Sequence, residues 1–325
     1  MKLTVRSEQW PVTGRFTTSR GSQTEVEVVV GTLEADGVTG RGEATPCGRY
    51  GESAAKSVGE LEDIASELRR GKNINELLAG MAAGATRNAL DAACWDFCCK
   101  QSGQRITELL GLPKLQPVTT TYTISINTPE KMEASARDNA HRPLLKVKTG
   151  RDAVIASVEA VRRGAPESVL IVDANEAWPA EELTDLLDAM AGLGVRLVEQ
   201  PLPAGRDALL AKMRRPLPVV ADESVHVASD IEALRDRYDG VNLKLDKTGG
   251  LTEALRARKI AGEHGMLFMC GCMLGTSLAM APAMVLAQTA DVVDLDAPLL
   301  LAGDRPDAIV YNDSEMRPYS SLLWG

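Results

Sequence analysis

Five polar residues recur at a regular spacing in the middle of the chain, each at or just past the end of an apolar run. They are Lys148, Asp173, Glu199, Asp222 and Lys244, and the intervals between them are 25, 26, 23 and 22 residues. Each interval matches one strand followed by one helix, so the side chains are expected at equivalent ends of successive parallel strands. Those ends meet at one mouth, where barrel enzymes build their active sites.

The three carboxylates predict a divalent metal site. Asp173, Glu199 and Asp222 supply oxygen donors alone, without Cys or His. Such a ligand set suits a hard cation such as Mg²⁺ and leaves positions open for water or substrate. Each carboxylate could instead cap the helix that follows its strand. We favour the metal because the three lie in register with two lysines.

The flanking lysines predict proton transfer. Lys148 and Lys244 belong to strands on either side of the metal strands, so a substrate on the metal would have a base on each face. Burial near a cation pushes ammonium groups toward the neutral form that a base requires. Lys146 shares the strand face of Lys148 and would add positive charge without exchanging protons. A structural ion pair with Asp173 or Asp222 is the alternative for any one lysine.

A metal flanked by two bases specifies a reaction type. One base removes a proton α to a carboxylate, and the cation stabilises the resulting enolate. Return of the proton to the opposite face gives epimerisation, whereas a leaving group in the β position gives elimination. The bases alone do not choose between these outcomes.

Two kinds of element must position these residues. Residues 1–115 read as an α+β unit, with strands at 2–11 and 25–34, a Gly-rich loop at 40–53, and helices at 54–70, 74–81 and 84–101. From residue 116, eight Val/Ile/Leu-rich runs alternate with amphipathic segments, among them 153–162 and 182–190. This alternation favours a closed (β/α) barrel, because no GxGxxG follows any of the runs.

The composition of the chain argues against nucleic acid and membranes as binding partners. With 36 Lys plus Arg against 45 Asp plus Glu, the formal net charge is −9. This negative charge disfavours binding to nucleic acid or to an anionic membrane. No apolar stretch approaches the length of a membrane-spanning helix, and the N-terminus shows no secretory segment. We therefore expect a cytoplasmic protein with a small-molecule substrate and no nucleic-acid or membrane partner. The sequence leaves open whether the protein forms a homo-oligomer.

Several motifs together resemble the enolase superfamily. KVK, VDANEAW, VEQPLP, ADES, NLKLDKTGGL and DLDAP, in this order, resemble its muconate-lactonizing-enzyme subgroup, and RYGES and RNALDAACWDF resemble its N-terminal capping domain. The resemblance implies a modified TIM barrel, (β/α)₇β, over residues 116–297. It also implies an α+β capping domain over 1–115, to which the C-terminal segment 298–325 returns. The last strand would then lack a following helix.

Within the subgroup, the chain resembles the dipeptide epimerases. The resemblance implies a Mg²⁺-dependent isomerase acting on a dipeptide, with L-Ala-D/L-Glu favoured, and a place in peptidoglycan peptide recycling. Its DxD motif implies that Asp294 and Asp296 receive the α-ammonium of the dipeptide. Two carboxylates facing one way are costly unless a cation joins them, although a solvated strand-end turn is the alternative.

The resemblance also implies further substrate contacts. Four residues would line the path of the dipeptide, largely through backbone groups: Thr123, Cys272, Met273 and Leu274. The distal carboxylate of a glutamate should meet a cation from the capping loops, where Arg20 and Arg49 are available.

Three kinds of alternative stay open from the sequence: another reaction at the same site, another dipeptide as substrate, and binding without catalysis. The same metal and lysines would serve N-acyl amino acid racemisation, o-succinylbenzoate synthesis or cycloisomerisation. The capping loops could select a different dipeptide. A barrel that has lost catalysis could bind peptides, although binding alone needs no paired bases.

Overall fold

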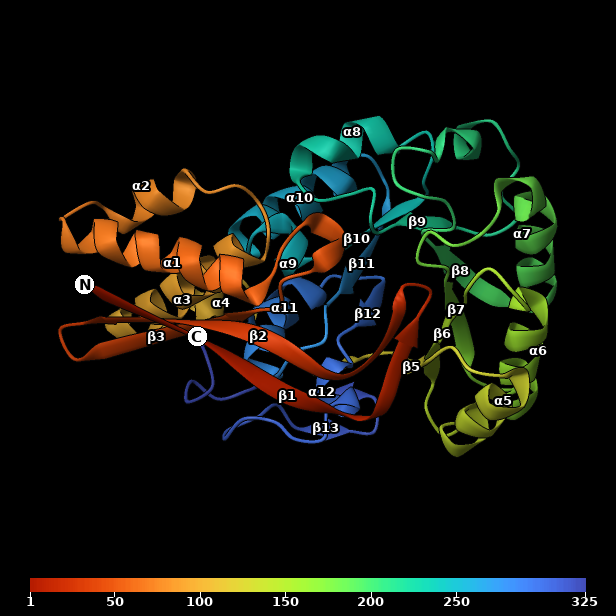
Figure 1. Ribbon diagram of the computed structural model, residues 1–325, viewed down its shortest axis with the longest axis horizontal. Coiled ribbons are helices and arrows are strands. Elements are labelled where there is room, and N and C mark those ends of the chain that lie inside the picture. Colours follow the sequence, from red (N-terminus) through yellow and green to blue (C-terminus); the bar gives the residue numbers. More distant parts are fainter.

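The computed structural model describes all 325 residues and places an antiparallel sheet with its helices beside a parallel barrel (Figure 1). The antiparallel sheet has the order β1 (Lys2–Thr18), β2 (Gly21–Ala35), β3 (Val38–Ala44). The helical elements that follow it are η1 (Gly48–Tyr50), α1 (Ala54–Arg69), α2 (Ile74–Ala79), α3 (Ala85–Ser102) and α4 (Ile106–Leu109). No helix in the chain has both the length and the apolar character required to cross a bilayer.

Strands β1 and β2 form a long ribbon whose tip reaches the barrel (Figure 1). The predicted strands are present, and both extend to a tight turn at Ser19 and Arg20. Strand β2 is buried on both faces along its middle. Val28 and Val30 pack into the main core with the barrel, whereas Val29 packs into a second core under α1 and α3. The ribbon is thus anchored between two apolar layers.

The predicted loop at residues 40–53 is wrong in its first part, which is strand β3. Gly40 and Gly42 lie in this strand and face α3. A Cβ on Gly42 would overlap the carbonyl oxygen of Ala89, and one on Gly40 would overlap that of Ala93. Glycine lowers strand propensity, which hid the strand in the sequence, but here it lets the sheet approach the helix backbone closely.

The parallel sheet contains eight strands in chain order, one in each predicted run. The strands are β5 (Tyr122–Ile124), β6 (Leu144–Lys148), β7 (Val169–Asp173), β8 (Val195–Glu199), β9 (Val219–Ala221), β10 (Gly240–Lys244), β11 (Leu267–Gly271) and β12 (Val292–Asp294). A parallel bridge between Thr120, just before β5, and Val293 of β12 joins the two ends of the sheet. This bridge closes the barrel, as the sequence predicted.

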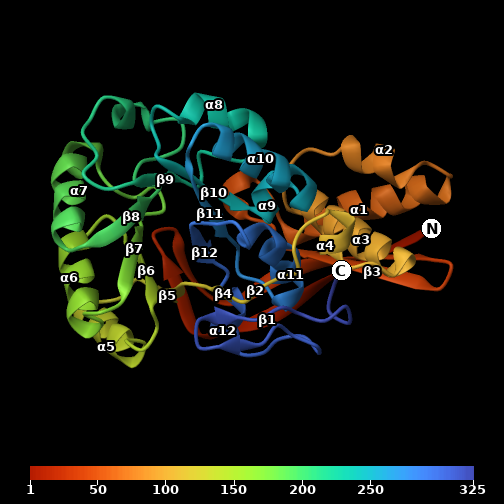
Figure 2. The same cartoon turned by 180° about the vertical axis from the view of Figure 1, so that it is seen from behind.

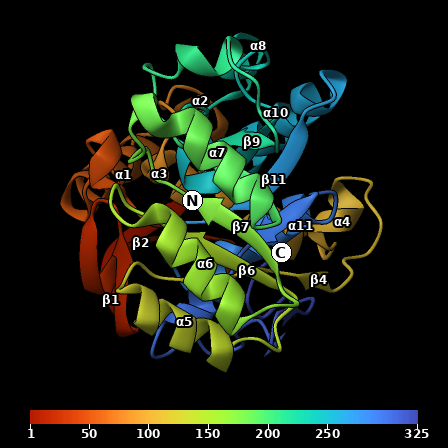
Figure 3. The same ribbon diagram turned by 90° about the vertical axis from the view of Figure 1, so that its right-hand side faces the viewer.

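Helical connections cover the outside of the barrel, with α5, α6 and α7 along one side (Figure 3). They are α5 (Pro129–Asp138), α6 (Val154–Gly164), η2 (Ala180–Glu182), α7 (Leu183–Gly192), η3 (Ala208–Ala211), η4 (Ala228–Asp230), α8 (Ile231–Leu234), α9 (Leu245–Thr248), α10 (Leu251–Glu263) and α11 (Ser277–Ala287). The segments predicted as helices at 153–162 and 182–190 are α6 and α7. Between β8 and β9 there is only the short turn η3 instead of a full helix.

No crossover helix follows the last barrel strand, which confirms the (β/α)₇β form. Only the four-residue α12 (Ala297–Leu300) follows β12, and β13 (Tyr311–Asn312) and β14 (Glu315–Met316) then pair with β4 (Val118–Thr119). The chain ends against α3 (Figure 2). There Trp324 Nε1 donates to the Ala92 carbonyl at 3.0 Å, and the Gly325 amide donates to Asp96 at 2.8 Å.

Strand β3 also fixes part of the barrel mouth. Thr45, just after β3, donates from Oγ1 to the Leu274 carbonyl at 2.6 Å. Buried Glu43 accepts from the Thr276 amide at 2.7 Å, just before α11. Every residue of α11 is buried. The antiparallel sheet therefore holds the loop after β11 in place.

The close approach of β3 to α3 gives a stability prediction. Gly42→Ala should lower the free energy of unfolding by about 1–3 kcal/mol, because the methyl group must displace helix backbone. The matched control is Gly59→Ala in α1, where a Cβ meets nothing within 4 Å, and there stability should rise by about 0.5–1 kcal/mol. Urea unfolding followed by circular dichroism measures both, and an unchanged Gly42→Ala midpoint would contradict the packing argument.

Candidate active site

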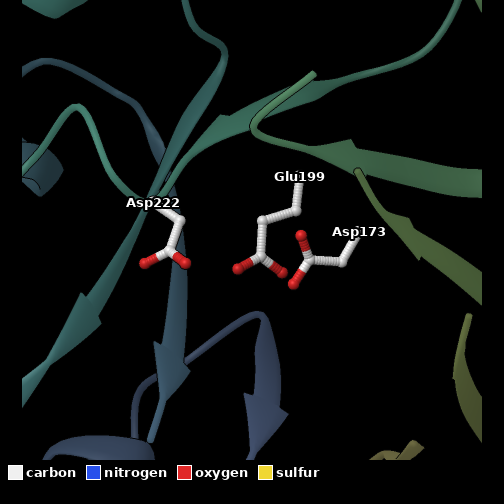
Figure 4. Close-up of side chains that lie close together, drawn as sticks. All are labelled: Asp173, Glu199 and Asp222. Atoms are coloured by element: carbon white, nitrogen blue, oxygen red, sulfur yellow. The ribbon is translucent and has the colours of Figure 1, made fainter. Parts of the chain in front are cut away.

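Three carboxylates meet at the mouth of the barrel, as predicted. Asp173 ends β7, Glu199 ends β8, and Asp222 follows β9. One oxygen of each lies within 4.8 Å of the others, and all three residues are at most 1% exposed. Figure 4 shows Glu199 between the two aspartates, with the carboxylates pointing into a common space.

Strand alternation explains why these side chains point inward. A layer of six buried apolar side chains fills the barrel below the site: Leu144, Ile171, Leu197, Val220, Met269 and Val292. Asp173, Glu199 and Asp222 each come two residues after a member of this layer. Because side chains alternate between the two faces of a strand, the carboxylates share the inner face with that layer.

The two predicted bases lie on opposite sides of the carboxylates. Lys148 Nζ donates to Asp173 Oδ2 at 2.6 Å, and Lys244 Nζ donates to Asp222 Oδ2 at 2.7 Å. Their strands, β6 and β10, are separated in the barrel by the three carboxylate-bearing strands. The structure therefore brings together all five residues of the spaced series.

Lys146 lies at the centre of the acidic groups. Its Nζ is 3.0 Å from Asp173, 2.8 Å from Glu199 and 2.7 Å from Asp294. The contact with Glu199 Oε2 lacks hydrogen-bond geometry, and no other donor reaches that oxygen. A buried carboxylate oxygen without a hydrogen bond is costly. This unsatisfied oxygen and the all-oxygen donor set fit a divalent cation bound by the three carboxylates.

The protein charges shift the pKa values in opposite directions. Burial and the charge of Asp173 raise the pKa of Glu199 to about 7. Burial also raises the pKa of Asp222, but Lys244 and Lys247 outweigh it and hold that pKa well below its usual range. Burial lowers the pKa of Lys244, but the charges of Asp222, Glu199 and Asp173 together outweigh it and raise the pKa of this lysine. With protein charges alone Lys244 stays protonated, whereas a cation would favour its neutral form.

Lys247 is a functional-site residue that the sequence reasoning missed. It is fully buried in α9, and its Nζ lies 2.5 Å from Asp222 Oδ1 and 3.1 Å from the Asn242 carbonyl. It also contacts the carbonyl oxygen of Asp222. The regular spacing pointed to strand ends only. The signal that could have found Lys247 is its position three residues after Lys244, one helical turn further along.

The DxD pair lies beside the same lysines. Asp294 accepts from Thr121 Oγ1 at 2.6 Å and from Lys146 Nζ at 2.7 Å. Asp296 accepts at Oδ2 from the Thr123 amide at 2.7 Å, and its other oxygen has no protein hydrogen bond. Burial and the charge of Asp294 raise the pKa of Asp296 to about 7. A cation at the free oxygen of Asp296 would relieve this repulsion.

One cavity of about 410 Å³ connects most of the predicted residues. Those that line it are Arg20, Thr123, Lys146, Lys148, Lys244, Cys272, Met273, Leu274, Asp294 and Asp296. The three clustered carboxylates do not line it, because the lysines cover them.

The two arginines of the capping loops differ in position. Arg20 lines the cavity, and its Nη2 contacts Glu176 at 3.0 Å and also contacts buried Glu223. Arg49 does not line the cavity. Its Nε and Nη2 both donate to Glu176, at 2.8 and 2.9 Å. Arg20 is thus the candidate for a substrate anion, and Arg49 belongs to an ion pair beside it.

Several known proteins are similar to this chain. L-Ala-D/L-Glu epimerase of Escherichia coli is 43% identical over 96% of this chain and 98% of its own length. N-acetyl-D-glutamate racemase of a Pseudoalteromonas species is 42% identical over 88% of this chain and 91% of its own. An enolase family member from Agrobacterium tumefaciens with homology to dipeptide epimerases was solved with sodium and L-Ala-L-Glu. It is 48% identical with a TM-score of 0.96, over 99% of both chains.

Two family models match the chain. Residues 1–111 match the N-terminal domain of mandelate racemase and muconate lactonizing enzyme, and residues 131–312 match the enolase C-terminal domain-like model. The resemblance drawn from the motifs is thereby confirmed. By sequence, fold and the carboxylates and lysines at the barrel mouth, the chain belongs to the mandelate racemase and muconate lactonizing enzyme family of the enolase superfamily.

Proposed function

We propose that this protein is a Mg²⁺-dependent dipeptide epimerase that inverts the α-carbon of the C-terminal residue of L-Ala-D/L-Glu. The observation that carries the proposal is the cavity itself. It contains Lys148 and Lys244 from opposite sides of the carboxylate cluster, together with the DxD pair. Neither a peptide-binding module nor a structural protein needs two opposed bases over a metal site.

The lysines divide the proton transfer between the two faces of the substrate. In one direction Lys148 removes the α-proton and Lys244 returns one to the opposite face, and in the other direction they exchange roles. A Mg²⁺ ion on Asp173, Glu199 and Asp222 would hold the substrate carboxylate and make the α-proton more acidic. Lys146, already bonded to Asp294 and close to the cluster, stays charged.

The DxD pair favours a free amino terminus over an N-acyl group. The free oxygen of Asp296 and the neighbouring carboxylate of Asp294 would share one ammonium group. An acyl amide carries no charge to balance two buried carboxylates. The likeness to N-acetyl-D-glutamate racemase makes N-acyl racemisation the second candidate, and the two substrates can be compared directly.

The distal carboxylate of the substrate is assigned to Arg20. This guanidinium lines the cavity from the tip of the β1–β2 ribbon. Its contact with an anion would explain a preference for glutamate over neutral residues. We further propose, from the family resemblance, that the enzyme acts in the cytoplasm on dipeptides released during peptidoglycan recycling.

Deuterium uptake tests the reaction. With Mg²⁺ and L-Ala-L-Glu in D₂O, the wild-type protein should form L-Ala-D-Glu that carries one α-deuterium. Lys148→Ala and Lys244→Ala should each lower epimerisation by about 10³-fold or more, while one of them still exchanges deuterium with a single enantiomer. Chiral chromatography with mass spectrometry measures both. Full epimerisation by either variant would contradict the two-base scheme, and no exchange on any dipeptide would contradict the function.

Loss of a carboxylate should weaken the metal site. Asp222→Asn should lower the affinity for Mg²⁺ by about 100-fold, measured by isothermal titration calorimetry. Because Asp222 also pairs with two lysines, Glu199→Gln is the second variant, and the same loss is expected. Asp236→Asn, on an exposed carboxylate, is the matched control. Unchanged affinity in both site variants would remove these carboxylates from the metal site.

The free oxygen of Asp296 predicts a selective loss of dipeptide binding. Asp296→Asn should raise KM for L-Ala-L-Glu by about tenfold, because the charged partner of the ammonium is lost. Deuterium exchange into N-acetyl-L-glutamate, which has no ammonium, should not fall. Steady-state kinetics measures the KM for the dipeptide and the rate of exchange into N-acetyl-L-glutamate. An unchanged KM for the dipeptide would place its amino terminus elsewhere.

A further inference from the structure

Glu176 joins three loops from distant parts of the chain. Its carboxylate accepts two hydrogen bonds from Arg49, at 2.8 and 2.9 Å, and one from Arg20 Nη2 at 3.0 Å. It also accepts from the amide of Ala204, in the loop after β8, at 2.8 Å. Arg20 belongs to the ribbon tip and Arg49 to the loop before α1. One side chain, 9% exposed, thus ties both capping loops to the barrel.

The backbone around Glu176 is held in an uncommon conformation. Asn175 and Glu176 have φ values of 43° and 68°, in the left-handed region that few residues other than glycine adopt. The Glu176 amide donates to the Gln200 carbonyl at 2.9 Å, and Ser19 Oγ donates to the Asn175 carbonyl at 3.0 Å. Such conformations persist only where surrounding contacts hold them. Here the turn directs the Glu176 carboxylate to the capping loops.

The guanidinium of Arg20 is held through a single nitrogen, Nη2. Its Nη2 contacts Glu176 and Glu223, whereas Nε and Nη1 donate no hydrogen bond to the protein. The guanidinium lines the cavity that also contains Lys148 and Lys244. The N–H groups of Nε and Nη1 therefore remain available for charge-assisted hydrogen bonds to a substrate carboxylate.

Arg49 balances the charge of this group. Two arginines, Arg20 and Arg49, share two glutamates, Glu176 and Glu223. Without Arg49, the two glutamates would exceed the charge of Arg20 and repel an anionic substrate. Arg49 therefore supports anion binding although it lies outside the cavity.

We propose that Glu176 is a positioning residue for substrate selection, which holds Arg20 so that its remaining N–H groups, at Nε and Nη1, meet the distal carboxylate of an acidic dipeptide. This inference rests on the proposed function, because it takes such a dipeptide as the substrate. Glu176 touches none of the reacting groups, so it acts through Arg20. Glu223 also holds Arg20, but it adjoins the proposed metal ligand Asp222, and Glu176 is the cleaner position to change.

Substrate discrimination is the first measurement. Glu176→Gln should raise KM for L-Ala-L-Glu by about tenfold and change kcat by less than about twofold, because anion binding is weakened and proton transfer is not. For the neutral L-Ala-L-Gln, kcat/KM should stay unchanged. Arg49→Gln should act in the same direction, and Glu181→Gln, in an exposed ion pair with Arg151, is the matched control.

Limited trypsin digestion is the second measurement, and it needs no substrate. Trypsin cleaves after arginine, so Arg20 and Arg49 report on their own loops. Glu176→Gln should speed cleavage after Arg20 by about fivefold, since a loop without its anchor opens more often. Glu181→Gln should be cleaved at the wild-type rate, and mass spectrometry identifies the cut sites.

The outcomes separate this inference from the proposed function. Wild-type protein inactive on acidic dipeptides would contradict the proposed glutamate preference, and with it the selective role of Glu176. Faster cleavage in Glu176→Gln would still show that this residue anchors the loops. Unchanged cleavage would overturn the inference whatever the activity. Faster cleavage with unchanged preference for L-Ala-L-Glu over L-Ala-L-Gln would overturn the role in selection.

Discussion

The burial of three carboxylates side by side is the constraint on which the rest of the site depends. Like charges in a dry environment repel one another, and each also loses its hydration. Four lysines form ion pairs with these carboxylates and offset the repulsion: two from β6, one from the end of β10 and one from α9. The three lysines of β6 and β10 reach the carboxylates only from specific strand positions, so the barrel register determines the chemistry.

The two sheets of the molecule contribute different properties. The barrel supplies the charged groups, on or next to strands that pair with a neighbour on either side. The antiparallel sheet supplies the residues that close the cavity, on loops tied down by a few ionic contacts. Contacts from Glu43 of β3 and from Thr45, the residue after it, also fix the loop after β11 that carries Cys272 to Leu274. Catalysis and selectivity therefore rest on separate parts of one fold.

The sequence predicted the elements and residues that leave a periodic trace. One charged residue per strand–helix unit revealed Asp173, Glu199 and Asp222, and apolar periodicity revealed the eight barrel strands. Strand β3 was missed because its glycines serve a helix contact that no local pattern records. The pairing of Arg49 with Glu176 joins positions 127 residues apart. Such a contact follows from the packing of loops and has no signature along the chain.

The β1–β2 ribbon has a consequence for how such a protein can diverge. Its middle is clamped between two apolar cores, while its tip, a two-residue turn, reaches the cavity at the barrel mouth. Mutations at the tip alter neither the clamp nor the strands that carry the lysines. New substrate preferences can therefore arise by changes to a few tip residues, without a passage through unfolded or inactive intermediates. Two relatives at 42–43% identity, named for a dipeptide and for an N-acetyl amino acid, are consistent with this evolutionary freedom.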